Sequence, residues 1–330
     1  MKKHIYLSLI LAGFGCFTVS AQQFAPVGTA VAQFLEIGVG ARATAMGEAY
    51  TAITDDAGSV FWNPAGLSDI EHREVYLAYT SWPAEIAIGG LAFGWNLEDI
   101  GTVAISAVYL STDDMLVTTE FDPEGTSGQM FNITNYALGL SYSRYMTERL
   151  SVGITGKLVR EDYFGYGYTA WALDLGTIYH TGFNGLNLAM SILNFGPEIN
   201  FDGTYIDYSN PRSYGTGTEI EFDNYSLPVL FRIGISIDVI ADAQNKLLAA
   251  VDMVHPNNNL EQYNIGLEYG FQQMFFLRGG YKLQIDEGGL TLGLGVKYPV
   301  NQDMAVQLDY SYNDFGVLSD IHRISFGFGF

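Results

Sequence analysis

Apolar and polar residues alternate with a period of two along most of the chain. In residues 304–312 every even position is large and apolar, and every odd position is small or polar. The same alternation occurs in residues 150–158, 263–271 and 290–298. A period of two is that of a β-strand with one apolar and one polar face. The pattern therefore predicts an all-β protein built from amphipathic strands.

Turn signals divide this alternating region into about fourteen strands. Their lengths of roughly 9 to 13 residues suit a membrane crossing and are long for a soluble β-sandwich. A soluble sandwich also alternates, and the sequence does not show which face points outward. Strand length and the even strand number favour a transmembrane antiparallel β-barrel. The predicted strands start near Val75, Ile86, Thr102, Ile133, Leu150, Thr169, Leu186, Ser226, Lys246, Gln262, Met274, Leu290, Met304 and His322.

The spacing of the predicted strands also indicates which way the barrel faces. The two longest breaks, at 112–131 and 196–224, follow the third and seventh strands and therefore lie at the same end. Short connections such as those at 147–148, 272–273 and 300–301 lie at the other end. Bacterial barrels have long loops outside the cell and short turns in the periplasm. The long breaks are therefore predicted to be extracellular.

The chain starts like an exported protein. Lys2 and Lys3 precede an apolar stretch that ends near Val19, and small residues lead up to Ala21. This pattern predicts a signal peptide over residues 1–21, with cleavage after Ala21. Cys16, the one cysteine, leaves with it, so disulfides and cysteine chemistry are excluded from the mature chain.

Composition narrows the class of protein further. The 330 residues include 38 Gly, 22 Tyr and 21 Phe, yet after the signal peptide no apolar run is long enough for a helical membrane span. For an exported, aromatic-rich chain of this kind, a closed barrel in the bacterial outer membrane is the common solution. The net charge of −21 argues against nucleic-acid binding, which needs clustered Lys and Arg.

The chain ends in an alternating strand with aromatic residues at Phe326, Phe328 and Phe330. A terminal Phe in such a strand resembles the signal that the barrel assembly machinery recognises in its clients. The alternative is an ordinary last strand. We predict an assembly signal here because a predicted signal peptide starts the same chain.

Residues 22–73, between the signal peptide and the predicted barrel (74–330), do not alternate. The Ala-rich stretch 41–50 predicts a short helix, although Gly47 weakens it. Such a segment can fold back into the barrel as a plug, or hatch. A periplasmic tail is the alternative, but its apolar residues would then lie in water.

Three motifs in this segment carry a family resemblance. They are the run 34–43 (FLEIGVGARA) with 46–49 (MGEA), the triplet 55–57 (DDA), and 62–67 (WNPAGL). Together they closely resemble the PorV/PorQ family, a branch of the long-chain fatty acid transporter-like barrels. The resemblance implies an N-terminal hatch whose motif is Asn63-Pro64-Ala65. The family includes outer-membrane components of the type IX secretion system, and one member is implied to hold cargo proteins that carry a C-terminal sorting domain.

Residues 63–66 are the main candidate site in the hatch. Pro64 restrains Asn63 to extended geometry and ends any helix there, and Asn63 is able to bond its own backbone in a turn. We interpret Asn63, Pro64, Ala65 and Gly66 as a structural corner joining hatch to barrel, with a gating role as the alternative. The neighbouring Asp55 and Asp56 suit either a cation or, more simply, a solvated helix end.

Three functions remain open, and none requires a cofactor or a metal. A secretion-associated, non-enzymatic binding protein would contact type IX components or cargo through loop tyrosines. A transporter of hydrophobic small molecules would need an apolar pocket and a lateral opening, for which Pro228 or Gly234 would break strand pairing. A lipid hydrolase is least favoured, because the histidines lie on different segments with no serine elbow. The loop tyrosines are Tyr166, Tyr168, Tyr205, Tyr208 and Tyr214, and the histidines are His72, His180, His255 and His322.

Overall fold

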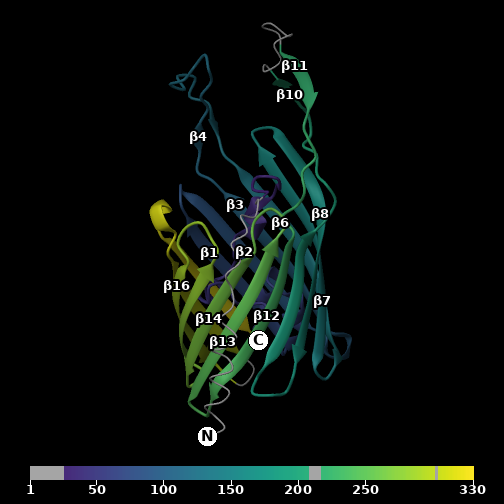
Figure 1. Cartoon of the computed structure of the whole chain (residues 1–330), viewed down its shortest axis with the longest axis vertical. Helices are drawn as coiled ribbons and strands as arrows, with labels where there is room; N and C mark the ends of the chain where they lie inside the picture. The colour runs from purple at the N-terminus through teal and green to yellow at the C-terminus, as the bar shows by residue number, and fades with distance from the viewer. Residues whose placement is uncertain (1–25, 208–216, 302–303) are drawn as a thin grey trace.

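The protein is a closed antiparallel β-barrel of fourteen strands (Figure 1). The computed structural model describes residues 26–207, 217–301 and 304–330. The predicted fold class and strand number are confirmed. The barrel strands are β1 (Arg73–Trp82), β2 (Ile86–Asn96), β3 (Thr102–Ser111), β6 (Thr134–Thr147), β7 (Leu150–Tyr163), β8 (Tyr166–His180), β9 (Asn187–Phe195), β12 (Leu230–Ala241), β13 (Asn245–Pro256), β14 (Gln262–Phe271), β15 (Phe275–Leu283), β16 (Leu290–Pro299), β17 (Ala305–Asn313) and β18 (Ile321–Gly329).

The barrel closes where the first strand meets the last. β1 pairs with β18 in an antiparallel register that joins Val75 to Phe328 and Ser81 to His322. Each remaining barrel strand pairs antiparallel with its neighbours. No strand edge is left along the barrel, which removes the unpaired backbone groups that a membrane interior does not tolerate.

The two faces of each strand differ as a membrane barrel requires. On the outward face of β16 and β17, Leu294 and Leu308 are 58% and 53% exposed. On the inward face of β17, Asp309 and Ser311 are buried. A soluble sandwich would bury the large apolar side chains, so this distribution distinguishes the barrel from the sandwich.

Two loops project far beyond one end of the barrel (Figure 1). The loop after β3 contains the short strands β4 (Met115–Leu116) and β5 (Met130–Phe131), and the loop after β9 contains β10 (Thr204–Asp207) and β11 (Thr218–Glu221). These two small ribbons were not predicted. The end that carries them is the extracellular end, and short turns such as the one between β14 and β15 lie at the periplasmic end.

Residues 26–72 form short helical turns and irregular structure. The elements are η1 (Gln33–Glu36), α2 (Ala41–Ala45), η2 (Ala57–Phe61) and η3 (Pro64–Asp69), with η4 (Glu98–Ile100) and η5 (Gly316–Leu318) in loops further on. The predicted helix over 41–50 is shorter than expected, because Gly47 and Glu48 take positive φ values of 63° and 64°. No helix in the described residues has the length and apolar character needed to cross a membrane.

Candidate functional site

The segment 26–72, here called the N-terminal segment, lies in the barrel lumen. Its helix α2 packs against β15, β16, β17 and β18, and η3 packs against β3, β6, β7 and β8 on the other side. Most of its side chains from residue 38 to 70 are buried. The segment therefore spans the lumen from wall to wall.

Glycines on the inner face of the barrel make room for this segment. A Cβ atom on Gly280 would lie 2.2 Å from the backbone carbon of Met46, and one on Gly153 would lie 2.3 Å from that of Pro64. Real Cβ atoms do not approach backbone this closely, so no larger residue fits without movement. The high glycine content of the chain is explained in part by this close approach, because only glycine leaves room for the backbone of the N-terminal segment in the lumen.

Asn63 holds the middle of the N-terminal segment to the barrel wall. Its side-chain oxygen accepts from the amide of Ala65 at 3.1 Å, and its Nδ2 donates to the carbonyls of Thr51 at 3.0 Å and Thr177 of β8 at 3.2 Å. The residue is extended, with φ −154°, and Pro64 begins η3 directly after it. One amide thus joins two parts of the segment to the barrel.

The rest of this motif is packed tightly. A Cβ on Gly66 would lie 2.3 Å from Oγ1 of Thr54, so glycine is needed there. The carbonyl of Ala65 accepts from the Ser143 hydroxyl of β6 at 3.0 Å. Residues 63–66 therefore sit against the wall of β6, β7 and β8, rather than at the junction with β1, which starts at Arg73.

A buried charge network ties the opposite side of the segment to the wall. Nε of Arg42 lies 3.0 Å from Oε2 of Glu268 on β14, and Arg42 also pairs with Asp55. Glu268 in turn accepts from Arg278 of β15 at 2.6 Å, and Arg278 reaches Asp309 of β17 at 2.6 Å. Cations and carboxylates alternate along this series of contacting side chains. Each buried charge therefore has a neighbour of opposite charge.

A second charged group lies closer to the extracellular end. Glu48 pairs with Lys282 of β15, and its other oxygen lies 4.0 Å from the guanidinium of Arg232 on β12. Burial opposes ionisation of Glu48, but Lys282 and Arg232 outweigh it and hold its pKa below the usual value. Burial instead raises the pKa of Glu36, which faces the same region. The group combines three cations, counting Arg323, with two carboxylates.

A cavity of about 760 Å³ lies above these charges, between the N-terminal segment and the extracellular loops. Its lining includes Glu48, Arg232 and Lys282, and it mixes apolar side chains with polar ones such as Asp286 and Asp314. A cavity of this size accepts a small ligand. The apolar lining residues include Phe34, Trp82, Ile86, Leu110, Leu230, Phe315 and Ile321.

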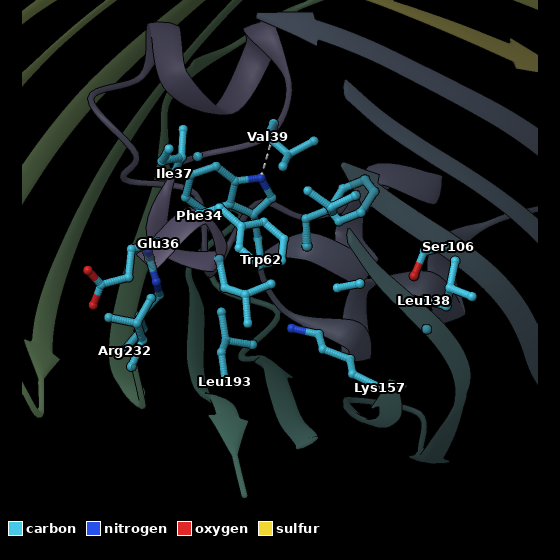
Figure 2. A pocket seen from close by; sticks show the side chains of 17 residues that line it. Phe34, Glu36, Ile37, Val39, Trp62, Ser106, Leu138, Lys157, Leu193 and Arg232 are labelled. Atoms are coloured by element: carbon cyan, nitrogen blue, oxygen red, sulfur yellow. Dashed lines mark hydrogen bonds between the residues drawn. The ribbon is translucent and has the colours of Figure 1, made fainter. Parts of the chain in front are cut away.

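Beside this cavity, the contact between the N-terminal segment and the wall leaves little space (Figure 2). The gap between residues 34–39 and the strands β3, β6, β7, β9 and β12 has a volume of about 30 Å³. Trp62 closes it from the segment side, with its Nε1 donating to the Val39 carbonyl at 2.9 Å and Arg232 lying 4.9 Å above its ring. This is room for about two water molecules.

The loop tyrosines differ in position. Tyr166 and Tyr205 are exposed, and each lies against Phe222 with ring centroids 5.4 and 5.2 Å apart. Tyr168 is only 2% exposed and donates to Glu161 at 2.7 Å, so it is not available as a surface contact. It belongs to the inward face of β8. Tyr208 and Tyr214 lie outside the described residues.

Phe326 and Phe328 lie on the outward face of β18, and Phe330 follows that strand directly. Phe328 and Phe330 stack with ring centroids 5.2 Å apart, and Phe326 is partly exposed toward the lipid. Phe330 also exchanges two backbone hydrogen bonds with Arg73 of β1, at 2.9 and 3.1 Å. The final residue thus closes the barrel seam.

The histidines lie far apart in the fold. His180 contacts Tyr145, which in turn donates to Asp69, while His255 lies 3.3 Å from Glu261. Nδ1 of His322 forms a hydrogen bond of 2.8 Å with the hydroxyl of Tyr310 on the outer surface. In the part of the chain that the structure describes, no group of three or more His, Cys, Asp or Glu residues has a metal-binding arrangement.

Two further sequence expectations change with the structure. Asp55 pairs with Arg42, and Asp56 caps η2 through Ser59, so both carboxylates have protein partners. Gly234 pairs in register with Asp252 and Ala189, so it opens no gap in the wall. The prediction that it breaks strand pairing is wrong, because a glycine on the inner face makes room for Thr51 and Ala52 instead.

The lumen-filling segment and the fourteen-stranded wall suit one family. The family model described as "Type IX secretion system protein PorV" matches residues 19–256, which is most of the chain. The chain belongs to the PorV family. The match includes the N-terminal segment and the wall from β1 to β13, whereas β14 to β18, which carry Glu268, Arg278, Lys282 and Asp309, follow it in the chain. A PorV-family barrel of this kind is a bacterial outer-membrane protein, as the sequence predicted.

Solved structures similar to this PorV-family chain share its fold. The toluene transporter TbuX of Ralstonia pickettii has 13% identity and a TM-score of 0.58, covering 88% of this chain and 97% of its own. A FadL homologue of Pseudomonas aeruginosa has 10% identity and a TM-score of 0.57, with 88% and 98% covered. The toluene transporter TodX of Pseudomonas putida has 12% identity and a TM-score of 0.53, with 86% and 96% covered. No curated protein sequence matches the chain.

The charges in the lumen were not predicted, although the sequence contains a signal of them. Arg232, Glu268 and Arg278 occupy inward positions of strands whose outward positions are apolar. A charge at an inward position of a membrane strand needs a partner inside the barrel. Their partners Arg42 and Glu48 lie far away in sequence, so only the three-dimensional structure identifies them.

Proposed function

We propose that this protein is a non-enzymatic, secretion-associated outer-membrane component that binds a partner protein through its extracellular loops. The N-terminal segment acts as a hatch that keeps the lumen closed while the loops work. In this proposal residues 1–21 are a signal peptide, 22–73 the hatch and 74–330 the barrel. The partner is a type IX secretion component or a cargo protein with a sorting domain.

The observation that carries the proposal is the character of the two projecting loops. Between residues 112 and 133, five acidic side chains occur without any Lys or Arg, and a further six occur in 196–207 and 217–229. Large apolar side chains stand exposed among them. Phe121 is 96% exposed, and Met130 and Ile206 are more than half exposed. Exposed apolar groups clear of the membrane are typical of protein-binding surfaces.

The charge of the loops indicates the kind of partner. A surface on which carboxylates far outnumber basic side chains attracts a basic protein surface and speeds its association at low salt. The exposed apolar side chains supply the contact area that charge alone does not. We therefore expect the partner to present Lys and Arg around an apolar centre.

A binding assay with the full-length protein tests this proposal. The probe is an immobilised C-terminal sorting domain from a secreted cargo of the same bacterium. We expect binding that weakens as salt rises, and we expect replacement of 204–221 by a Gly-Ser linker to abolish it. That replacement keeps the Ile199–Tyr225 bridge at the base of the loop. Equal binding by the loop-replaced variant would contradict the proposal.

The matched control changes acidic residues at the other end of the barrel. Glu98 and Asp99 lie in the periplasmic turn between β2 and β3 and are exposed. Glu98→Gln with Asp99→Asn removes two negative charges without touching the extracellular loops. We expect binding to the sorting domain to stay unchanged in this variant.

Transport of a hydrophobic small molecule is the second candidate function. The cavity of about 760 Å³ with its apolar lining residues supports it. Mass spectrometry of the protein extracted gently from its native membrane separates the two candidates. A stoichiometric hydrocarbon or fatty acid without a protein partner would favour transport, and a co-purified protein with a sorting domain would favour secretion.

The assembly of the barrel belongs to the same proposal. Phe326, Phe328 and Phe330 form the signal by which the barrel assembly machinery takes up the chain. We expect deletion of Phe330 to reduce the amount of folded protein in the outer membrane while the exported chain accumulates unfolded.

A further inference from the structure

A groove runs along the outer, lipid-facing surface of the barrel over β6, β7 and β8. Its floor is formed at Gly156 of β7, whose register partners are Leu140 of β6 and Leu173 of β8. A Cβ atom at Gly156 would have no heavy atom within 4 Å outside its immediate chain neighbours. The wall is closed beneath it, because β6 and β7 pair continuously past this point. The depression is therefore a surface feature.

Large apolar side chains form the rim of the groove. Trp171 is 54% exposed, and Leu138 and Leu158 are nearly half exposed. Together with Val103, Leu140, Tyr142, Ile154 and Leu173 they border an open depression of about 730 Å³. An acyl chain lying against Gly156 would contact these side chains on both flanks.

The two ends of the groove differ in charge. Toward the extracellular end, the outward residue after Leu158 is Arg160, which pairs with Asp162 at 3.0 Å. Toward the periplasmic end, the outward residue after Tyr142 is Arg144, which is exposed and forms no ion pair among the described residues. The available positive charge therefore lies at the periplasmic end.

A second cation accompanies Arg144. Arg149 lies in the turn after β6, where its Nη1 donates to the carbonyl of Thr181 at 3.4 Å. Glu148 is the acidic residue of that turn, and the neighbouring β2–β3 turn, whose Gly101 lies against Arg144, adds the exposed Glu98 and Asp99. The phosphate contacts are therefore Arg144 and Arg149 themselves and not a net positive charge of the rim. Arginines at a membrane surface attract anionic lipid headgroups, and each contributes about 1 kcal/mol.

We propose that this groove binds one anionic phospholipid of the periplasmic leaflet. One acyl chain lies along Gly156 between Leu138, Leu158 and Trp171, and the phosphate lies at Arg144 and Arg149. The site requires the outer-membrane location but not the proposed function, because it is separate from the lumen and the extracellular loops. A phospholipid fits better than a protein partner, since the groove lies at membrane depth and ends at an unpaired cation.

Native mass spectrometry of the full-length protein tests this site. The probe is palmitoyl-oleoyl phosphatidylglycerol, titrated in dodecyl maltoside micelles, with phosphatidylethanolamine as the zwitterionic comparison. We expect one tightly held phosphatidylglycerol per barrel. Arg144→Gln is expected to weaken its binding about fivefold and to remove the preference over phosphatidylethanolamine. Gly156→Leu, which fills the groove, is expected to remove binding of both lipids.

Two variants serve as matched controls. Gly279 of β15 is also an outward glycine, and a Cβ there meets only ordinary contacts at 3.7 and 3.8 Å. Gly279→Leu and Arg160→Gln should therefore leave lipid binding unchanged. Equal lipid loss in Gly156→Leu and Gly279→Leu would show general annular lipid and overturn the proposal. A loss in Arg160→Gln but not in Arg144→Gln would place the lipid in the other leaflet and overturn it as well.

Discussion

Arg42 and Glu268 form an ion pair inside the barrel, with Nε and Oε2 3.0 Å apart and both side chains largely buried. Arg42 comes from the N-terminal segment and Glu268 from β14, so the pair joins the lumen filling to the wall. Arg278 and Asp309 extend it into a chain of alternating charges. Removing one member of such a series leaves its buried neighbours with one opposite charge fewer.

We therefore expect Glu268→Gln to loosen the N-terminal segment. Breaking a buried pair by removing one partner costs about 3–5 kcal/mol. Hydrogen exchange of backbone amides in residues 40–60 should become faster, while amides of the barrel strands stay protected. Lys246→Ala is the control, because its pair with Asp238 is partly exposed and contributes little. Unchanged exchange in Glu268→Gln would show that the network does not hold the segment.

Gly280 and Gly279 are adjacent in β15 but face opposite sides of the wall. A Cβ on Gly280 would lie 2.1 Å from the backbone nitrogen of Gly47, whereas one on Gly279 meets only ordinary contacts. We expect Gly280→Ala to lower the free energy of unfolding by about 1–3 kcal/mol through overpacking. Gly279→Ala should leave it nearly unchanged. Urea unfolding followed by gel mobility measures the stability of both variants. Equal unfolding midpoints would mean that the backbone at Gly47 shifts to make room for the added methyl group.

Asn63→Ala should detach the middle of the N-terminal segment from β8. The substitution removes the hydrogen bonds to Thr51, Thr177 and Ala65 and leaves their buried backbone groups unpaired, at a cost of about 1–3 kcal/mol each. Limited proteolysis from the periplasmic side should then cleave near Pro64. Asn200→Ala, in an exposed loop, is the control. Resistance equal to that of the wild type would assign Asn63 no anchoring role.

The strand positions follow closely from the sequence. β3 begins at Thr102, β14 at Gln262 and β16 at Leu290, as the alternation predicts. Residues that face lipid are apolar, and residues that face the filled lumen are small or polar. Neighbouring residues therefore alternate, and the alternation can be recognised within a single strand. The same alternation bears on Tyr168, which was predicted to be a loop contact. It shares the inward parity of Ala170 and Ala172, which would have placed it inside.

The content of the lumen follows less directly. The family motif places Asn63 and Pro64 in a hatch, but nothing local to the sequence identifies Thr177 or Gly153 as the residues that they contact. Those contacts depend on how the segment crosses the barrel, which is a long-range property. The ribbons β4–β5 and β10–β11 were missed for another reason. Paired strands of two or four residues are too short to give a periodic signal.

The N-terminal segment should also be more stable in mild acid. Asp56 is buried and lies beside Asp55, and these effects raise its pKa to about 6 from an ordinary value near 3.8. Because the folded state binds this proton more tightly, the proton's stabilising effect is present below about pH 4 and is lost as the pH rises through 6. We expect Asp56→Asn to weaken this dependence, and Asp99→Asn, in an exposed turn, to leave it as in the wild type. Protease resistance of residues 50–62 measured between pH 4.5 and 7.5 checks the difference. A wild-type profile that is flat over this range would show that Asp56 stays ionised in the lumen.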